Sequence, residues 1–403
     1  MKTKNPEFWQ QGDDYWTPEI IASNRAQGET GRIPVSGGGY SGPFAGPGFD
    51  SMWTDMSEIV RPTRDGIHGR EYISTAIDLG KNPGPFNLRE GWLKDSQILA
   101  KPQQRLEISL PLIFDLLPLQ FWPLPPLPAV AQAAKEVNTL FIWKAEEIGE
   151  ELRAFTPWLC PYIDSFREDK SGLISMVRMV QIPYQDKNQT IETIKEIKKF
   201  NPQIVVAIRM ALHRGVEADV LDMIKMGGEV IHLLADEKGR EQVADRPIFL
   251  KDLIRQIHLR LVKEKCRDQV TLIFGGGIAL AEHMAKAIIC GADGISLDLP
   301  LLIAWECRLC RRCVKGRSCP VEIDKAEPEW AKQRIINLMA AWHGQILEVL
   351  GAMGIRDVRR LRGESGRAIF LEEIEEETFG QIFRRTRAAS EVREKEYALP
   401  SPN

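Results

Sequence analysis

The chain has 403 residues, of which 43% are hydrophobic and 27% charged, so it is long and apolar enough to bury a large core. Its formal net charge of −3 gives no reason to expect a nucleic acid or an anionic membrane surface as a partner. Residues 1–16 contain no apolar core and no small-residue cleavage site, so no signal peptide is expected.

Residues 1–105 are rich in Gly, Pro, Trp and polar residues and show little periodicity. The stretch 37–49, GGGYSGPFAGPGF, has the composition of a loop. We therefore predict an irregular N-terminal arm, which wraps another surface instead of forming a core of its own.

The segment 110–134 is apolar and long enough to suggest a membrane span. It contains six prolines and the charged residue Asp115. Prolines break a membrane helix, and a charge adds to the cost of insertion. We expect a buried strand here, followed by a proline-rich loop over the core, and we expect no transmembrane segment.

From about residue 106 to 300, short apolar runs alternate with amphipathic stretches. The runs typical of strands are Leu106–Phe114, Leu140–Trp143, Leu159–Ile163, Ile174–Val180, Ile204–Met210, Val230–Leu234, Val270–Phe274 and Gly294–Leu297. Helical patterns between them are Gln189–Lys199, Glu217–Met226, Phe249–Lys263 and Leu280–Cys290. This alternation predicts an α/β fold, and eight candidate strands fit a TIM-type (β/α)8 barrel. A doubly wound open sheet is the alternative, which periodicity does not exclude.

Three glycines, Gly275 to Gly277, stand between the strand VTLIF and the helical run ALAEHMAKAII. A glycine turn in this position lets backbone N–H groups approach a phosphate, and the N-terminus of the helix favours negative charge. In TIM barrels such a site lies in the loops after strands seven and eight, and this turn follows the seventh predicted strand. A tight turn without any ligand is the alternative.

Four cysteines stand close together before a proline. They are Cys307, Cys310, Cys313 and Cys319, followed by Pro320. The spacing C-x2-C-x2-C-x5-C-P lets one loop place several soft thiolates around an inorganic core, which predicts an iron–sulfur cluster. Cations that would offset its negative charge lie between the cysteines, namely Arg308, Arg311, Arg312, Lys315 and Arg317. Zinc or disulfides are the alternatives, although zinc loops usually present two separated C-x2-C pairs.

The other cysteines, Cys160, Cys266 and Cys290, lie far apart in mostly apolar contexts. Buried free thiols are the expected state, consistent with a reducing compartment, and we expect the protein in the cytoplasm. After the cysteines, the pattern predicts a helix from near Glu327 to Leu350 and a polar, charged tail. The sequence thus predicts an arm at 1–105, a barrel at 106–300, an iron–sulfur loop at 301–325, and C-terminal helices with the tail at 326–403.

The run 270–298, VTLIFGGGIALAEHMAKAIICGADGISLD, and the cysteine loop with its ending CPVEI resemble the FMN-binding domain of glutamate synthase. That family carries a GG turn, a helix, a GAD motif and a cysteine cluster that ends in CPVGI. VEADV at 216–220 and LRGE at 361–364 are further matches. The resemblance extends from about residue 50 to 380 and is most specific between 270 and 323.

The resemblance implies a (β/α)8 barrel with FMN and an iron–sulfur cluster, which reduces the imine formed from 2-oxoglutarate and ammonia. It assigns the cluster ligands to Cys307, Cys313 and Cys319. Cys310 supplies a fourth thiolate, as in some shorter relatives, which favours a [4Fe–4S] over a [3Fe–4S] cluster. The residues that the resemblance places around FMN are Gly275, Gly276, Gly277, Gly294 and Ser296.

The chain also departs from the family pattern. IFDLLPLQFWP replaces a serine- and glycine-rich segment after the first strand, and a GEGG element has no counterpart. The family's lysine meets Ile208 or Arg209, depending on the register, and residues 236–240, DEKGR, replace a glycine-rich loop. Asp298 stands where a second phosphate-binding glycine is usual, and a carboxylate there would repel a flavin phosphate. We therefore expect FMN binding and substrate chemistry to be eroded, and the cluster to be kept.

Two functions agree with these observations. The first is a glutamate-synthase-like iron–sulfur flavoprotein, the oxidoreductase subunit of a multisubunit complex. Because the sequence shows no amidotransferase domain and no nicotinamide-binding fingerprint, its expected partners are an electron-donor protein or reductase subunit and an amidotransferase subunit. The second is a non-catalytic electron-transfer or scaffold subunit that has lost FMN and 2-oxoglutarate chemistry. No catalytic residue is predicted, and His232, inside an apolar strand, is expected to be a core histidine.

Overall fold

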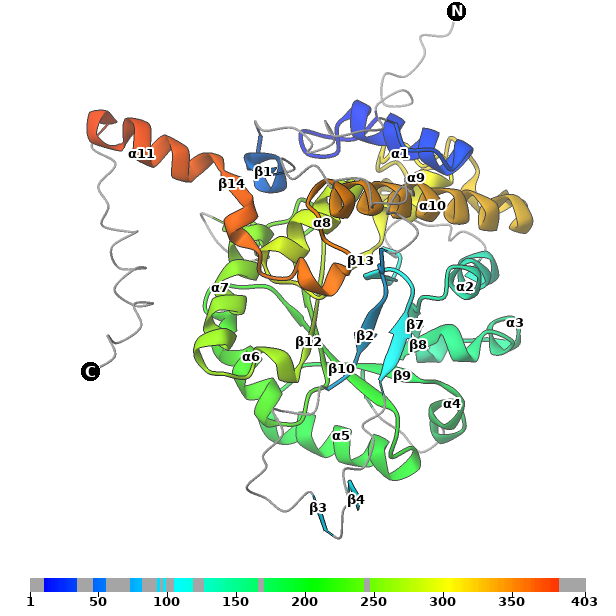
Figure 1. Cartoon of the computed structure of the whole chain (residues 1–403). Coiled ribbons are helices and arrows are strands. Elements are labelled where there is room, and N and C mark those ends of the chain that lie inside the picture. The colour runs from blue at the N-terminus through cyan, green and yellow to red at the C-terminus, as the bar shows by residue number, and fades with distance from the viewer. Residues whose placement is uncertain are drawn as a thin grey trace, which may run out of the picture.

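The computed structural model describes residues 11–34, 46–55, 73–81, 93–94, 97–98, 105–118, 127–165, 170–242 and 247–383. Its centre is a closed barrel of parallel strands, in which each strand pairs with the next in the chain and the last with the first (Figure 1). The barrel strands are β6 (Leu112–Phe114), β7 (Phe141–Lys144), β8 (Leu159–Tyr162), β9 (Met179–Pro183), β10 (Val205–Ala211), β11 (Val230–Leu234), β12 (Thr271–Gly275) and β13 (Gly294–Leu297). The predicted (β/α)8 fold is confirmed, and the open sheet is excluded.

Helices surround the barrel (Figure 1). They are α2 (Leu127–Glu136), α3 (Glu150–Arg153), α4 (Ser171–Met176), α5 (Lys187–Phe200), α6 (Val216–Lys225), α7 (Leu250–Lys263), α8 (Ala281–Cys290), α9 (Leu299–Ala304) and α10 (Pro328–Ala352). The long helix α10 packs against both α2 and α8, so it fills the last position of the outer ring. The helices predicted within 189–290 and at 327–350 are confirmed, with boundaries that differ by one or two residues.

Two predicted strands differ from the observed ones. The run 106–114 is split into β5 (Leu106–Ile108) and β6, because the chain makes a tight turn at 109–111, where Leu112 N–H donates to the Leu110 carbonyl at 2.7 Å. In the predicted run 174–180, residues 174–176 form the end of α4. The strand itself, β9, begins only at Met179 and extends to Pro183.

The segment expected to be a proline-rich loop contains α2. Alanines at 129, 131, 133 and 134 give this helix a small, buried face that allows close approach to the barrel and α10. Residues 119–126 lie outside the described part of the chain. Among the described residues, no helix is both long and apolar enough to cross a membrane.

The N-terminal arm is less irregular than expected, because it contains α1 (Pro18–Thr30). The Thr17 side chain caps this helix, and Gly31 ends it at a φ of 67°. The sequence pattern does not predict this helix, because its apolar residues form only a weak stripe. In the structure it packs along α10. The four-part division of the chain stays a prediction.

Small ribbons flank the barrel. They are β2 (Ile77–Leu79) with β5, β1 (Met52–Thr54) with β14 (Ala368–Phe370), and β3 (Leu93–Lys94) with β4 (Gln97–Ile98). The β2–β5 ribbon covers the amino end of the barrel, where the Gly80 N–H donates to the Thr271 hydroxyl at the start of β12. The last described helix, α11 (Leu371–Phe383), projects from the body (Figure 1). With its amino end covered, the barrel has its carboxyl end left for a functional site.

Candidate functional site

Polar side chains from five strands meet inside the barrel, toward the carboxyl ends of the strands. We call this group the barrel network; its members are Asp115 directly after β6, Gln181 on β9, Arg209 on β10, His232 on β11 and Ser296 on β13. All are buried except Arg209, which keeps 15% of its side chain exposed. Catalytic side chains of TIM barrels come from the same end of the strands, so the network lies where chemistry is expected in this fold.

Arg209 is the cation of the network. Its Nη1 donates to Asp115 Oδ1 at 2.6 Å and to Gln181 Oε1 at 3.0 Å, and its guanidinium lies 5.9 Å from the centre of the Tyr162 ring. Ile208, its neighbour on β10, is fully buried, and its Cδ1 lies 3.0 Å from the Cβ position of Gly228. Of the two residues that the family's lysine can meet, Arg209 is therefore the one that provides a fixed charge inside the barrel, and its correspondence to the lysine stays a prediction.

A chain of hydrogen bonds links the other members. Gln181 Nε2 lies 2.8 Å from His232 Nδ1, and His232 Nε2 lies 2.8 Å from Ser296 Oγ. Ser296 Oγ donates to Asp115 Oδ2 at 2.9 Å. Because the Gln181 amide can only donate to Nδ1, these contacts assign the neutral tautomer of His232, with its proton on Nε2. Each polar atom in this chain then has a partner.

Burial and charge set the protonation states of the network. Burial alone would raise the pKa of Asp115, but the charge of Arg209, and the hydrogen bonds from Arg209 and the Leu116 N–H, outweigh it, so the pKa lies below its ordinary value. Burial, with the charge of Arg209, lowers the pKa of His232 to about 3 although Asp115 opposes the shift. The network thus holds one anion, one cation and a neutral imidazole at neutral pH. The prediction that His232 lies in the core is confirmed, and both nitrogens of its ring make hydrogen bonds there.

The glycine turn, Gly275–Gly277, is tightly enclosed by protein on one side. A Cβ on Gly275 would lie 2.1 Å from Ser296 Oγ. A Cβ on Gly276 would lie 2.4 Å from the Ala235 carbonyl oxygen, and one on Gly277 would lie 2.2 Å from the Gly239 nitrogen. Because Gly276 and Gly277 also have φ values of 87° and 67°, close packing of the loop after β11 requires glycine here.

The same turn also offers hydrogen-bond donors without a protein partner. Gly276, Gly277 and Ile278 are buried, and within the described part of the chain no acceptor is found for their backbone N–H groups. A buried N–H group without a partner costs about 1–3 kcal/mol, so an anion at this turn would be stabilised. The helix α8 begins three residues later and adds favourable potential. The turn therefore keeps the donors that the predicted phosphate site requires.

Of the two other residues predicted around FMN, Gly294 lies away from the turn, whereas Ser296 lies beside Gly275. Gly294 opens β13 at the amino end, where its Cβ position lies 2.8 Å from the Pro111 carbonyl oxygen. That close approach explains why residue 294 is a glycine. Ser296 is buried in the barrel network and bonded to His232 and Asp115. Their assignment to FMN stays a prediction.

Asp298 follows β13 and caps α9, where its Oδ1 accepts from the Leu299 N–H at 2.6 Å. Burial, and then the charge of Asp115, raise its pKa to about 7. A large part of this carboxyl is therefore protonated at neutral pH. Protonation weakens the repulsion that the sequence predicts between Asp298 and an anion bound nearby.

The cysteine loop, 307–319, follows α9 and is strongly curved. Leu309 and Arg311 have φ values of 46° and 55°, which are rare for residues other than glycine, and Gly316 has 66°. All four cysteines are free and partly buried. Burial, and then the nearby thiols of the other three cysteines, raise the pKa of Cys307 to about 12. The thiols thus lie near one another on a tightly turning backbone.

The thiols are not drawn together into a single-ion site. Among the described residues, no three His, Cys, Asp or Glu side chains are grouped closely enough to hold a metal ion. The donor set itself consists of four uncommitted thiols, which is the chemistry that an iron–sulfur cluster requires. Their assignment as cluster ligands stays a prediction.

The cysteine loop is attached to the carboxyl end of the barrel. Arg311 Nη2 donates to Glu237 Oε2 at 2.6 Å and to Asp13 Oδ2 at 3.3 Å. Glu237 belongs to the loop after β11, the strand that carries His232. Arg311, one of the basic residues expected to offset a cluster's charge, therefore has a second role, because it fixes the cysteine loop to the loop after β11.

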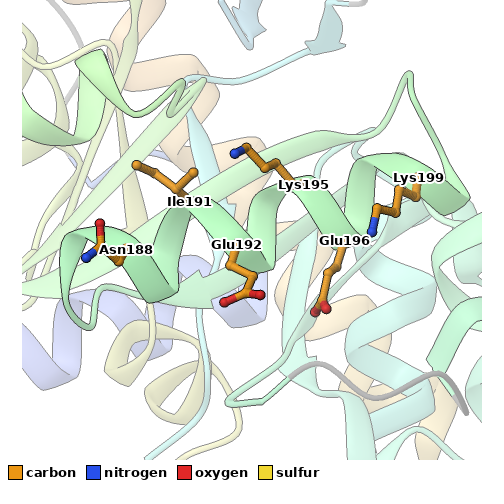
Figure 2. A pocket seen from close by; sticks show the side chains of 6 residues that line it. All are labelled: Asn188, Ile191, Glu192, Lys195, Glu196 and Lys199. Atoms are coloured by element: carbon orange, nitrogen blue, oxygen red, sulfur yellow. The ribbon is translucent and has the colours of Figure 1, made fainter.

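A separate hollow lies on the outer face of α5 (Figure 2). Its lining residues are Asn188, Ile191, Glu192, Lys195, Glu196 and Lys199. All of them belong to one helix, and no member of the barrel network reaches the hollow. The barrel network and the glycine turn are therefore the better candidate for a functional site.

Sequence reasoning missed most of the barrel network. In the sequence alone, Asp115 is only a charge that argues against a membrane helix, and no pattern singles out Gln181. The available signal was one polar residue inside each of several apolar strands, at positions that face the barrel interior. A strand pattern gives no partner for such a residue, so only the closed barrel shows that these side chains meet.

A family model, curated proteins and solved structures are similar to this chain. Residues 161–356 match the family model described as a conserved region in glutamate synthase. The chain is 24% identical over 428 residues to the archaeal glutamate synthase [NADPH] of Archaeoglobus fulgidus, covering 91% of this chain and 82% of that protein. It is 26% identical over 434 residues to the archaeal-type glutamate synthase [NADPH] of Thermotoga maritima, with coverages of 91% and 83%.

Among solved structures, a flavocytochrome b2 double mutant with pyruvate bound has a similar fold. The TM-score is 0.52 at 12% identity, and the match covers 98% of this chain and 84% of that one. At this identity the likeness concerns the fold alone.

Proposed function

The chain belongs to the glutamate synthase family, and from this premise we propose that it is a glutamate-synthase-like oxidoreductase whose chemistry takes place at the carboxyl end of its barrel. The observation that carries the proposal is the contact between Arg311 and Glu237, at 2.6 Å, which holds the cysteine loop at the carboxyl end of the barrel, toward which the barrel network lies. An electron carrier in that loop would lie next to a buried, charged site for a substrate.

The proposed electron carrier is an iron–sulfur cluster on the four cysteines of the loop. Thiolates are the ligands that such clusters need, and the tight backbone turns at Leu309 and Arg311 keep the four thiols on one short segment. The four thiolates favour a [4Fe–4S] cluster over a [3Fe–4S] cluster. When bound, such a cluster carries one electron at a time.

FMN is the second proposed cofactor. The unpaired N–H groups of Gly276, Gly277 and Ile278 fit a phosphate, and they are the residues that would hold it. When bound, FMN exchanges single electrons with a cluster and hydride with a substrate. The raised pKa of Asp298 makes this carboxyl compatible with a neighbouring anion, although a glycine at this position would suit the anion better.

Arg209 is the proposed binding group for a substrate carboxylate. Asp115 and Gln181 hold one edge of its guanidinium through Nη1, and the partly exposed remainder is available to a second acceptor. Arg keeps the positive charge of the family's lysine but offers a planar fork instead of a point charge. The proposed substrate class is a 2-oxo acid such as 2-oxoglutarate.

The proposed partners are an electron-donor protein or reductase subunit and an amidotransferase subunit, so the chain would act within a multisubunit complex. The relatives named above are described as [NADPH] enzymes, which supports a nicotinamide nucleotide as the first source of electrons. A cytoplasmic location stays a prediction.

The first experiment tests the cofactors. Protein purified without oxygen should contain iron and acid-labile sulfide in near-equal amounts, together with flavin. Cys313→Ser should lower iron and sulfide, whereas Cys266→Ser, which changes a partly buried cysteine outside the loop, should leave both unchanged. Stoichiometric zinc without sulfide would refute the cluster assignment.

The second experiment tests the reaction. With reduced viologen as donor, 2-oxoglutarate and ammonia, glutamate formation that is lost in Arg209→Ala and partly kept in Arg209→Lys would support the enzyme. We expect little turnover from the chain without its partners. Formation of glutamate at the same rate in Arg209→Ala would contradict the proposed role of the arginine.

The second candidate function is a non-catalytic electron-transfer or scaffold subunit. It is favoured by Asp298 and by the charged loop 236–240, which replace glycines of the family. A protein that holds a reducible cluster, takes up no FMN and makes no glutamate even with a donor and amidotransferase added would have this function.

A further inference from the structure

A short segment before α1 lies over the glycine turn. We call residues 12–16 the N-terminal strap. Its two aromatic side chains are buried, Tyr15 with 8% and Trp16 with none of its surface exposed, although the segment belongs to no helix or strand. Burial of two large aromatic rings in an irregular segment holds the strap firmly against the barrel.

Both rings donate hydrogen bonds to the loops of the candidate site. The Tyr15 hydroxyl donates to the Gly277 carbonyl at 2.5 Å, and Trp16 Nε1 donates to the Glu237 carbonyl at 2.7 Å. The first bond reaches the glycine turn, and the second reaches the loop after β11 that packs against the turn. The strap therefore clamps the two loops together.

The strap also reaches the cysteine loop. The Gly12 N–H donates to the Arg308 carbonyl at 2.9 Å. Asp13 pairs with Arg311 at 3.3 Å and with Lys238 at 3.7 Å, and its Oδ1 accepts from the N–H groups of Tyr15 and Trp16. One segment thus connects the cysteine loop, the loop after β11 and the glycine turn.

This arrangement has a consequence for any ligand at the turn. The unpaired N–H groups of Gly276, Gly277 and Ile278 lie in residues with almost no exposed surface, and the strap and the loop after β11 contact the turn. Movement of this cover would expose the turn, so it would speed the exchange of a phosphate bound there. The bonds made by Tyr15 and Trp16 oppose that movement.

We propose that the N-terminal strap is a lid that retains a phosphate monoester at the glycine turn, with Tyr15 and Trp16 as the residues that hold it closed. In the proposed function this ligand is FMN, so the inference rests on that function. Because the same strap binds the cysteine loop, the lid also keeps the proposed cluster and the flavin site in a fixed relation.

The test compares flavin release from wild type and Tyr15→Phe, which removes one hydroxyl and keeps the ring. Release of FMN is followed as an increase in flavin fluorescence after dilution. Loss of one hydrogen bond to a carbonyl should speed release about fivefold. Hydrogen exchange of residues 236–240 and 275–280 should also become faster, because the loops open more often.

Thr139→Val is the matched control. The Thr139 hydroxyl also donates to a buried backbone carbonyl, that of Leu112, but at the amino end of the barrel. This variant should lose similar thermal stability and leave FMN release unchanged.

The outcomes separate the lid from the function. If wild type holds FMN and Tyr15→Phe releases it at the wild-type rate, the lid is refuted and the flavin function stands. If wild type neither contains nor takes up FMN, the flavin function fails, and the lid fails with it. Faster release in Thr139→Val as well would show a general loss of stability, which also overturns the lid.

Discussion

The neutral, buried imidazole of His232 should make the protein sensitive to acid. Its pKa is lowered to about 3 in the folded state, against about 6.5 in an unfolded chain. Below pH 6.5 the unfolded state binds a proton that the folded state rejects, so stability is full above pH 6.5 and falls as the pH drops toward 3. At about 1.4 kcal/mol per unit, His232 should account for a loss of about 2 kcal/mol between pH 8 and pH 5.

His232→Gln tests this reasoning. Glutamine offers an acceptor for Gln181 and a donor for Ser296 but does not titrate in this range. We expect the variant to be about 1–2 kcal/mol less stable than wild type at pH 8, because the new side chain does not reproduce the ring geometry. At pH 5 the difference should vanish or change sign, because the variant lacks the imidazole's proton linkage.

The assay is urea unfolding at pH 8, 7, 6 and 5, followed by far-UV circular dichroism. Ile231→Val is the matched control, a fully buried change on the same strand that should cost about 1 kcal/mol at every pH. If His232→Gln and Ile231→Val show parallel pH profiles, His232 is not buried as a neutral group, and the tautomer assigned to the network is wrong.

Three further perturbations test the site. Gly276→Val should abolish FMN uptake and lower the free energy of urea unfolding by about 3 kcal/mol or more, because the φ of 87° and the carbonyl oxygen 2.4 Å from its Cβ position both oppose a branched side chain. Gly172→Ala, in open space on α4, should be neutral or stabilising in the same assay. Arg209→Ala should cost about 3–5 kcal/mol in urea unfolding at pH 7, because Asp115 stays buried without its cation, and the loss should shrink at a pH low enough to protonate Asp115. Asp298→Asn should stabilise the protein by about 2–4 kcal/mol at pH 8 and by less at pH 5, because a carboxyl whose pKa rises from 3.8 to about 7 on folding opposes folding increasingly between these two pH values. An equal effect at both pH values would contradict the raised pKa.

The sequence pattern alone predicts the alternation of strands and helices and the position of the glycine turn, and it favours a barrel, but only the closed sheet of the structure excludes the open-sheet alternative. Eight apolar runs separated by amphipathic stretches leave few arrangements, because parallel strands buried on both faces need a helix between each pair. The glycines at 275–277 were recognisable because a strand, a glycine turn and a helix follow one another directly. The dense cysteine spacing also needed no structure, since four thiols within one short loop are close by covalent connection alone.

The barrel network was decided by the tertiary structure. Asp115 and Ser296 are 181 residues apart, and Arg209 pairs with Asp115 across 94 residues, so no local pattern joins them. Closure of the sheet between β13 and β6 brings them together, because it sets the register that places Ser296 beside Ile113. On β10, side chains alternate between the two faces of the sheet, so Arg209 faces the barrel interior and its neighbour Ile208 faces away from it.

The contacts of the N-terminal strap are likewise not predictable from a local sequence pattern. Tyr15 and Gly277 are 262 residues apart, and the composition of residues 12–16 is that of an ordinary polar loop with two aromatic residues. Their burial depends on the loop after β11 and on the cysteine loop, which come from distant parts of the chain. Local periodicity therefore predicts elements, whereas contacts among loops at the end of a barrel exist only once the barrel has closed.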